Sequence, residues 1–468
     1  MKIRTFLLGT AIAGLTWRLW KRYLISPRRA AGAALPKRHN RTATGGYYVP
    51  SLLRLQVDTT NSLLNVNQLS DAKTEAVYLH EYCHFIQNVT TNCGLRHFYV
   101  SVNYLKFATH HIMASPPGTF PVPVNAVPAA NNVYANQELW KLYTGDGDAP
   151  DAQLTSHQLL HVPQHGQQVP LVVIGYVTPA GKTDTFAFGE HCISESMAYL
   201  LERSCYPATT AADDLPYHAA EKVVELLYPA FGQNPLNVLA LCDASLKAFN
   251  PGPFFYHTLL RIKARNLPIN VPEDVYAICN QASIHFNGAR TFNSLLPVNA
   301  QGAIQQLHDY FNDTRFDSLK LWLAQLIQAA VAYRQQHEPF PLAIARGGPL
   351  QRNRALAAFM HAAGTPLTTN LRGELSLADP GLAVPNTPYF YIWAIEEVQA
   401  VLTSVAKRDC QMVHFCRNSG VAVDRRCSTA PWTRTQEPGC AFGQMWRHWG
   451  LEGYSPALTK PARLSSRP

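Results

Sequence analysis

The hydrophobic and polar positions change their spacing along the chain. Short apolar or alternating runs at residues 47–58, 169–177 and 183–188 predict strands. Pro50 interrupts the first run, and a short Pro-Ala-Gly-Lys-Thr turn joins the other two into a predicted hairpin. Helical spacing dominates the later part of the chain. Strands early and helices late predict an α+β fold with a predominantly helical second half.

Two adjacent helical patterns also lie in the early part of the chain. The first follows an N-cap at Ser70 or Asp71, and Gly94 is its predicted stop. The second covers about residues 95–114, and a third predicted helix follows the hairpin. Further helical patterns lie at 216–229, 234–248, 253–265, 272–284, 297–336, 350–362 and 390–406. The Gly-, Pro-, Ser- and Thr-rich stretches predict loops in the 340s, at 364–388 and at 418–440.

The first of these helices carries side chains suited to a metal ion, in the sequence His-Glu-Tyr-Cys-His at residues 80–84. Histidines four positions apart on a helix lie on one face, so their ring nitrogens can converge on one ion. Glu81 would lie beside that ion, where its carboxylate can take a proton from a metal-bound water. It is the only formally charged residue between 76 and 94, and an isolated buried charge is costly without a partner or a chemical role. The alternative is a buried helix with two ordinary core histidines.

A catalytic zinc ion keeps three protein ligands and one open position, so a third ligand is needed. The helix after the hairpin carries Glu195, the only formally charged residue between His191 and Leu201. Small residues on both sides of Glu195 would let this helix approach the first one closely. We therefore predict that Zn²⁺ is bound by His80, His84 and Glu195. The alternatives for the third ligand are Glu190, His191 and Glu202.

These motifs resemble those of a known group of enzymes. An HExxH helix followed far downstream by a helical glutamate is similar to zincin metallopeptidases of the gluzincin type. The fuller pattern, His-Glu-Tyr-x-His-Phe-x-Gln with a later Ile-x-Glu-x-Met-Ala, is similar to uncharacterised bacterial HExxH proteins. The resemblance covers residues 47–202 at motif level. It implies a zincin-like core with a small sheet and an active-site helix, the three zinc ligands predicted above, and Glu81 as general base.

One position departs from the gluzincin pattern. Four residues after the ligand glutamate many gluzincins have an acidic residue that orients a histidine, and this chain has Tyr199. The orienting group must then come from elsewhere, and Glu202 and Asn88 are the candidates. Tyr256 and His257 are candidate donors to a developing oxyanion, although their aromatic surroundings also fit core packing.

The function that the resemblance implies is a zinc-dependent hydrolase, above all a metallopeptidase acting on a peptide or protein substrate through a zinc-activated water. The alternative is a non-catalytic zinc-stabilised binding or adaptor protein with a structural or vestigial site. Glu81 distinguishes the two, because a purely structural site has no use for a charge that is not a ligand.

Two further groups of residues could bind metal. Four of the ten cysteines, Cys410, Cys416, Cys427 and Cys440, lie close together with intervals of five, ten and twelve residues. A structural metal site, two disulfides or unrelated thiols would each fit; we favour the metal because the segment is poor in apolar residues and needs a cross-link. His414 and His448 lie nearby in the sequence. The histidines at 157, 161 and 165 are also four apart, but a proline interrupts them and they predict a solvated loop.

The net charge of +9 is concentrated at one end, since no Asp or Glu precedes Asp58. Residues 1–45 therefore predict a basic targeting or tether segment that could contact a membrane surface. The rest is nearly balanced, which argues against a nucleic-acid partner. We favour a cytoplasmic or membrane-associated protein, with export or organelle targeting by this segment as alternatives. The expected segments after it are a metal-binding core at 46–205, a helical region at 206–407 and a Cys-rich segment at 408–468.

Overall fold

The computed structural model describes residues 45–50, 53–62, 69, 71–208, 212–287, 290–377, 384, 387–403 and 409–457. They form a mixed α+β fold with a predominantly helical second half, so the predicted fold class is confirmed. The predicted N-terminal segment at 1–45 lies outside the described residues except for its last residue. Within the described part of the chain, every helix is too short or too polar to cross a membrane.

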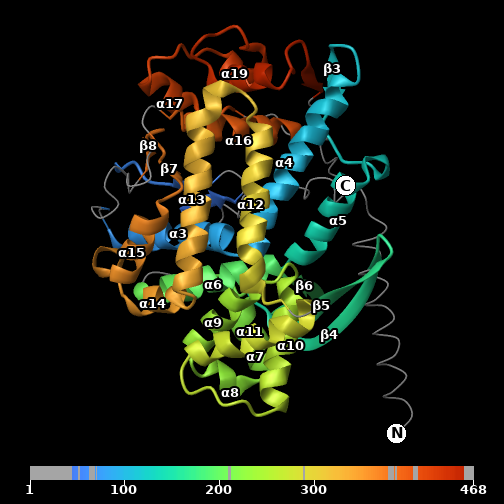
Figure 1. The fold of residues 1–468 in the computed structure, drawn as a ribbon, viewed down its shortest axis with the longest axis vertical. Helices are drawn as coiled ribbons and strands as arrows, with labels where there is room; N and C mark the ends of the chain where they lie inside the picture. Colours follow the sequence, from blue (N-terminus) through green and yellow to red (C-terminus); the bar gives the residue numbers. More distant parts are fainter. Residues whose placement is uncertain are drawn as a thin grey trace.

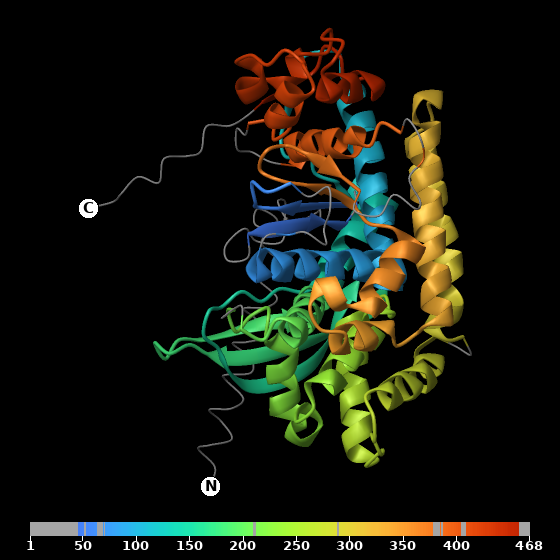
Figure 2. The same cartoon turned by 90° about the vertical axis from the view of Figure 1, so that its left-hand side faces the viewer.

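A small sheet and one helix form the centre of the molecule. The sheet has the order β1-β2-β7-β8, in which β2 and β7 are parallel and the other neighbours antiparallel. Helix α3 (Ala72–Thr90) packs on β1 and β2 and lies along one face of this sheet (Figure 2). The four strands are β1 (Gly46–Val49), β2 (Arg54–Val57), β7 (Leu367–Thr369) and β8 (Leu375–Ser376). Strands β7 and β8 lie in a stretch predicted as loop, because runs of two or three residues carry no readable period.

A second sheet is an antiparallel meander of β4 (Gln153–Gln164), β5 (Gln167–Val177) and β6 (Thr183–Phe188). The predicted β5–β6 hairpin is confirmed. The predicted loop around the three spaced histidines is wrong, because His157 and His161 lie on β4. Strand β4 is at the sheet edge, where a proline near the strand end is tolerated because one side of the strand needs no ladder hydrogen bonds. All three histidines are exposed, as expected.

Helices α3 and α4 (Asn92–Met113) follow each other almost without a break. The predicted cap is confirmed, since the Asp71 side chain accepts a hydrogen bond from the Thr74 amide. The predicted stop at Gly94 is wrong. Gly94 lies in the first turn of α4, where a Cβ atom would stand 2.3 Å from the carbonyl oxygen of Gln87. Glycine is needed there because the two helices touch backbone to backbone.

The second half packs around this centre. Helices α12 (Phe292–Tyr310) and α13 (Asp317–Gln336) form a long antiparallel pair beside α4 (Figure 1); the predicted continuous helix at 297–336 is therefore two helices. Helix α6 (Glu190–Cys205) packs on α3 and α9. The remaining central helices are α5 (Asn132–Thr144), α7 (Ala219–Leu227), α8 (Pro229–Gly232), α9 (Pro235–Leu246), α10 (Pro251–Ala264), α11 (Glu273–Asn287), α14 (Phe340–Arg346) and α15 (Arg354–Ala363).

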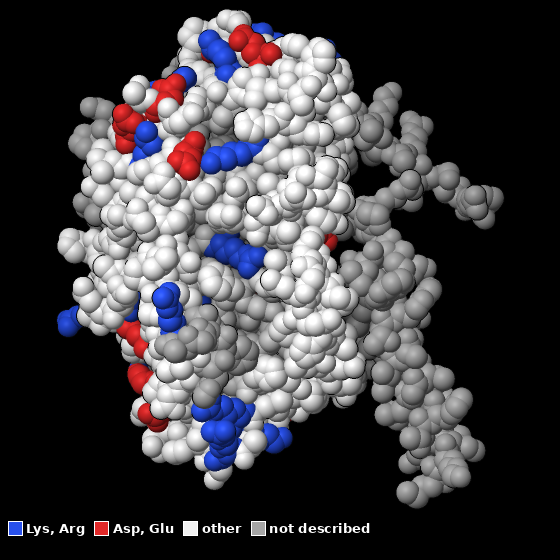
Figure 3. All heavy atoms as spheres, turned by 45° about the vertical axis from the view of Figure 1, so that its right-hand side comes forward, with Lys and Arg blue, Asp and Glu red and all other residues white. Residues whose placement is uncertain are grey.

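The C-terminal elements gather at one end of the molecule, opposite β4–β6 (Figure 2). Strand β9 (Ser455–Ala457) pairs in parallel with β3 (Thr119–Pro121), the strand that follows α4. Helix α16 (Phe390–Thr403) packs against α19 (Ala441–His448). The short helices α17 (Val413–Asn418) and α18 (Arg426–Thr429) lie between them in the sequence. On the face drawn in Figure 3, charged side chains form small groups separated by wide uncharged areas.

Candidate metal centre

The three predicted ligands come together where α3 and α6 pack. Oε2 of Glu195 lies 3.3 Å from Nε2 of His80 and 3.5 Å from Nε2 of His84. Adjacent ligand atoms around a tetrahedral zinc ion with bonds of about 2.0–2.1 Å stand about 3.3–3.4 Å apart. Among the described residues, this is the one group of three or more His, Cys, Asp or Glu side chains whose ligand atoms all lie within 4.8 Å of one another. The donor set and its spacing therefore fit a zinc ion.

The side chain of Gln87 sets the orientation of His84. Nε2 of Gln87 donates to the carbonyl oxygen of Ser194 at 2.9 Å, and Oε1 lies 2.8 Å from Nδ1 of His84. Because a backbone carbonyl only accepts, the amide of Gln87 can face it in one way, and Oε1 must then accept from Nδ1–H. The lone pair of His84 is left on Nε2, which points at Glu195. Gln87 also ties α3 to α6, because Ser194 belongs to the second helix.

The carboxylate of Glu202 sets the orientation of the His80 ring. Its Oε2 lies 3.0 Å from Nδ1 of His80, and since a carboxylate only accepts, Nδ1 carries a proton. A metal ion bound at Nε2 would then take the place of a proton on that nitrogen. Of the two predicted orienting groups, Glu202 is therefore the one that contacts a histidine. Asn88 instead accepts from the Tyr48 hydroxyl and donates to the carbonyl oxygen of Gly94.

The centre concentrates negative charge away from water. Glu81, Glu195 and Glu202 are each no more than 3 % exposed. Burial raises the pKa of Glu81 to about 7; the charges of His80 and His84 oppose this rise, and the charges of Glu195 and Glu202 add to it. Burial lowers the pKa of His80, but its hydrogen bonds to Glu195 and Glu202 outweigh burial and raise the pKa well above its usual value. Three buried carboxylates with two histidines call for a cation, and a divalent ion supplies it without proton uptake.

The alternative third ligands point elsewhere. Glu190 accepts from Nε2 of His97 at 2.9 Å, and His191 lies 3.6 Å from Asp148 near the surface. Both are on the first turn of α6, and Glu195 is on the next turn, facing α3. Of these three candidates, Glu195 is the one whose carboxylate lies beside both histidines; its role as a ligand stays a prediction.

The sequence did not mark Tyr217 as a residue of the candidate metal centre. Its ring meets the His80 ring edge to face, with centroids 5.9 Å apart. Burial, followed by the charges of Glu195 and Glu81, raises the pKa of Tyr217, so its hydroxyl stays neutral near the centre. It lies in the connection between α6 and α7, where no periodicity marks it. The predicted donor Tyr256 instead lies with its hydroxyl 3.0 Å from Nδ1 of His157 on β4.

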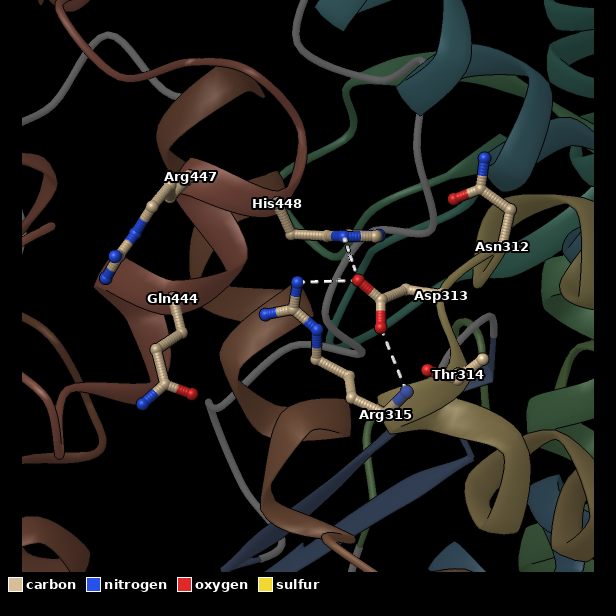
Figure 4. Close-up of a pocket in the computed structure, with 7 residues that line it drawn as sticks. All are labelled: Asn312, Asp313, Thr314, Arg315, Gln444, Arg447 and His448. Atoms are coloured by element: carbon tan, nitrogen blue, oxygen red, sulfur yellow. Dashed lines mark hydrogen bonds and ion pairs between the residues drawn. The ribbon is translucent and has the colours of Figure 1, made fainter.

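The centre is closed to solvent in this conformation. The side chains of His80, Glu81 and Glu195 are each 2 % exposed. A small cavity touches the centre at His84 and Gln87 and extends toward His97 and Glu190. A much larger open pocket of about 740 Å³ lies at the C-terminal end and contains none of the predicted ligands or cysteines (Figure 4).

The cysteine-rich segment lies apart from the centre on α3 and α6. Its four cysteines are free thiols that line one small cavity. His414 is exposed, and His448 lies in the pocket of Figure 4 beside Asp313, so neither histidine joins the cysteines.

No family model, no curated protein and no solved structure matches the chain. The zincin-like core that the motifs imply stays a prediction.

Proposed function

We propose that the chain is a zinc-dependent hydrolase that cleaves peptide bonds, with zinc held by His80, His84 and Glu195. The observation that supports it best is Glu81. Its Oε2 atom is buried beside the three ligands and has no hydrogen-bond partner among the described residues. A site that only joins two helices would gain nothing from a third buried carboxylate, and leaving a polar atom unpaired costs about 1–3 kcal/mol.

The side chains of this centre divide the steps of hydrolysis between them. A bound zinc ion supplies an activated water and polarises the substrate carbonyl. Glu81 accepts the proton of the water and returns it to the leaving amine. Glu202 and Gln87 hold the two imidazole rings with their lone pairs inward. Tyr217 donates its hydroxyl hydrogen bond from the His80 side, where negative charge develops on the carbonyl oxygen.

Burial limits the route by which a substrate reaches this centre. A polypeptide cannot contact groups that are 2–3 % exposed, so cleavage requires the elements around α3 and α6 to open. The same burial favours a second function, in which the ion joins α3 to α6 and no reaction follows. In that case the bound ion would stabilise the folded protein, and the protein would not hydrolyse peptides.

Glu81→Gln separates the two functions. The amide keeps the size of the side chain and removes its ability to take a proton, so we expect full zinc content, an unchanged far-ultraviolet spectrum and loss of hydrolysis of a mixed peptide library. Glu75→Gln is the matched control on the same helix, because Glu75 accepts from Tyr206 and Gln351 away from the centre. Hydrolysis by Glu81→Gln at the wild-type rate would refute the proposed role. Zinc-dependent stability without turnover in the wild type would favour the second function.

A further inference from the structure

The C-terminal unit, residues 409–457, is built from elements too short to be stable alone. Its helices α17, α18 and α19 have six, four and eight residues, whereas isolated helices below about 12–15 residues are marginal in water. One cysteine lies on or directly before each of these helices. Cys416 lies on α17, Cys427 on α18, and Cys440 is the N-cap residue of α19, while Cys410 precedes α17.

All four cysteines line a single small cavity. The other side chains lining it are mainly apolar, among them Met412 and Phe442. The backbone brings two of the cysteines side by side, because the amide of Cys410 donates to the carbonyl oxygen of Cys427 at 3.0 Å. Four cysteines are a ligand set that a structural zinc ion uses.

Hydrogen-bond donors are directed at two of the sulfur atoms. Arg434 is 2 % exposed and donates from Nη1 to Sγ of Cys427 at 2.8 Å. The amide of Gly443 donates to Sγ of Cys440 at 3.4 Å. A neutral thiol is a weak acceptor, whereas a thiolate accepts strongly from a guanidinium. Arg434 also binds the carbonyl oxygen of Ala422 and lies 3.4 Å from Asp424, so the protein holds this cation firmly beside the sulfurs.

We propose that Cys410, Cys416, Cys427 and Cys440 bind one structural zinc ion that holds the C-terminal unit together. Four thiolates and Zn²⁺ carry a net charge of −2, and the buried guanidinium of Arg434 offsets part of it. In the described part of the chain, only the centre on α3 and α6 has three ligand atoms within 4.8 Å. The proposal therefore requires the sulfur atoms to come closer together when the ion binds.

The bound ion would stabilise the end of the molecule that lies away from α6. The unit contacts the rest of the chain through the packing of α19 on α16 and through the β3–β9 pair. The amide of Gln411 also donates to the carboxylate of Glu397 on α16 at 3.0 Å. Loss of the ion should loosen 409–457 and leave the centre on α3 and α6 in place.

The test uses the full-length chain purified without chelator. We expect two zinc ions per chain in the wild type, one in Cys416→Ser and one in His84→Ala. Replacing zinc with cobalt shows which of the two sites has lost its ion. Wild type and His84→Ala should show a sulfur-to-cobalt charge-transfer band in the near ultraviolet. Cys416→Ser should lack this band or show it shifted and weakened. Cys279→Ser is the matched control, because Cys279 is a buried free thiol on α11 outside this unit.

Two results would overturn the proposal. One is a wild-type chain without the sulfur-to-cobalt band. The other is a thiol titration of the denatured, unreduced protein that finds six of the ten cysteines reactive, which would mean two disulfides in place of the site. The wild-type spectrum and titration need no variant, so they decide the case even if Cys416→Ser fails to fold. The wild-type cobalt band does not depend on the centre at His84, so failure of the proposed hydrolase would leave this result unchanged.

Discussion

Gln87→Ala is the sharpest perturbation of the metal centre, because Gln87 touches a ligand without being one. The substitution removes the acceptor of Nδ1–H on His84 and the donor to Ser194. His84 is then free to turn its ring or to place its proton on Nε2. Loss of such an orienting partner typically weakens metal binding about 10- to 100-fold, which is about 1.4–2.8 kcal/mol.

The assay is a competition titration of zinc against a chromophoric chelator at fixed pH, with unfolding in urea measured on metal-free and zinc-loaded protein. Stabilisation by a bound ligand follows RT ln(1 + [L]/Kd), so a 100-fold weaker Kd removes up to about 2.7 kcal/mol of the zinc-dependent stability. The sulfur-to-cobalt band reports the cysteine site separately.

Asn88→Ala is the matched control. Asn88 is the next residue on α3 and equally buried, but its amide binds Tyr48 and Gly94. We expect it to lower the stability of the metal-free protein and to leave the zinc Kd unchanged. An unchanged Kd in Gln87→Ala, or an equal loss in both variants, would refute the role assigned to Gln87.

Three further predictions follow from single contacts. Tyr217→Phe should keep its zinc and lose about 10²- to 10³-fold in kcat on the peptide library; wild-type turnover would contradict the role of its hydroxyl. Gly94→Ala should destabilise the fold by about 1–3 kcal/mol in urea unfolding because its Cβ would stand 2.3 Å from a carbonyl oxygen, whereas Gly302→Ala on α12, which has nothing within 4 Å, should be neutral or stabilising by up to about 1 kcal/mol. Burial raises the pKa of Glu338, but Lys247 and two asparagines outweigh burial and lower that pKa. The ionised Glu338 therefore stabilises the fold above its unfolded pKa of about 4.3. This stabilisation is lost as the pH falls through the lower pKa of the folded state. Glu338→Gln should flatten the acid side of a stability–pH curve, and an unchanged slope would contradict the assignment.

The cluster of His80, His84 and Glu195 could be predicted from the sequence because each of the three residues is marked by a local signal. Histidines at i and i+4 share a helix face wherever the helix lies in the fold, and an uncompensated carboxylate in an apolar helix stands out in the sequence. Glu81 and Glu195 both carry that second signal. The predicted cap at Asp71 and the β5–β6 hairpin depend on neighbouring residues in the same way.

The parts that could not be predicted depend on pairs of residues far apart in the chain. Glu202 was one of two candidates for the group that orients a histidine, and only the fold places its carboxylate at Nδ1 of His80. Gln87 appeared in the motif without a role. Tyr217 has no local signature, because its place beside His80 is set by the connection between α6 and α7. Gly94 looks like a helix stop in sequence, but the close approach of α3 and α4 is what requires glycine there.

The sequence by itself determined the α+β class, the helix that carries His80 and His84, and the isolated carboxylates. Periodicity and local charge suffice for these, since they follow from the geometry of one helix or one hairpin. Tertiary structure alone decided which side chains hold the histidine rings, and that four cysteines line one cavity. Those relations depend on the packing of distant segments, and helix spacing contains no information about which distant segment will lie opposite.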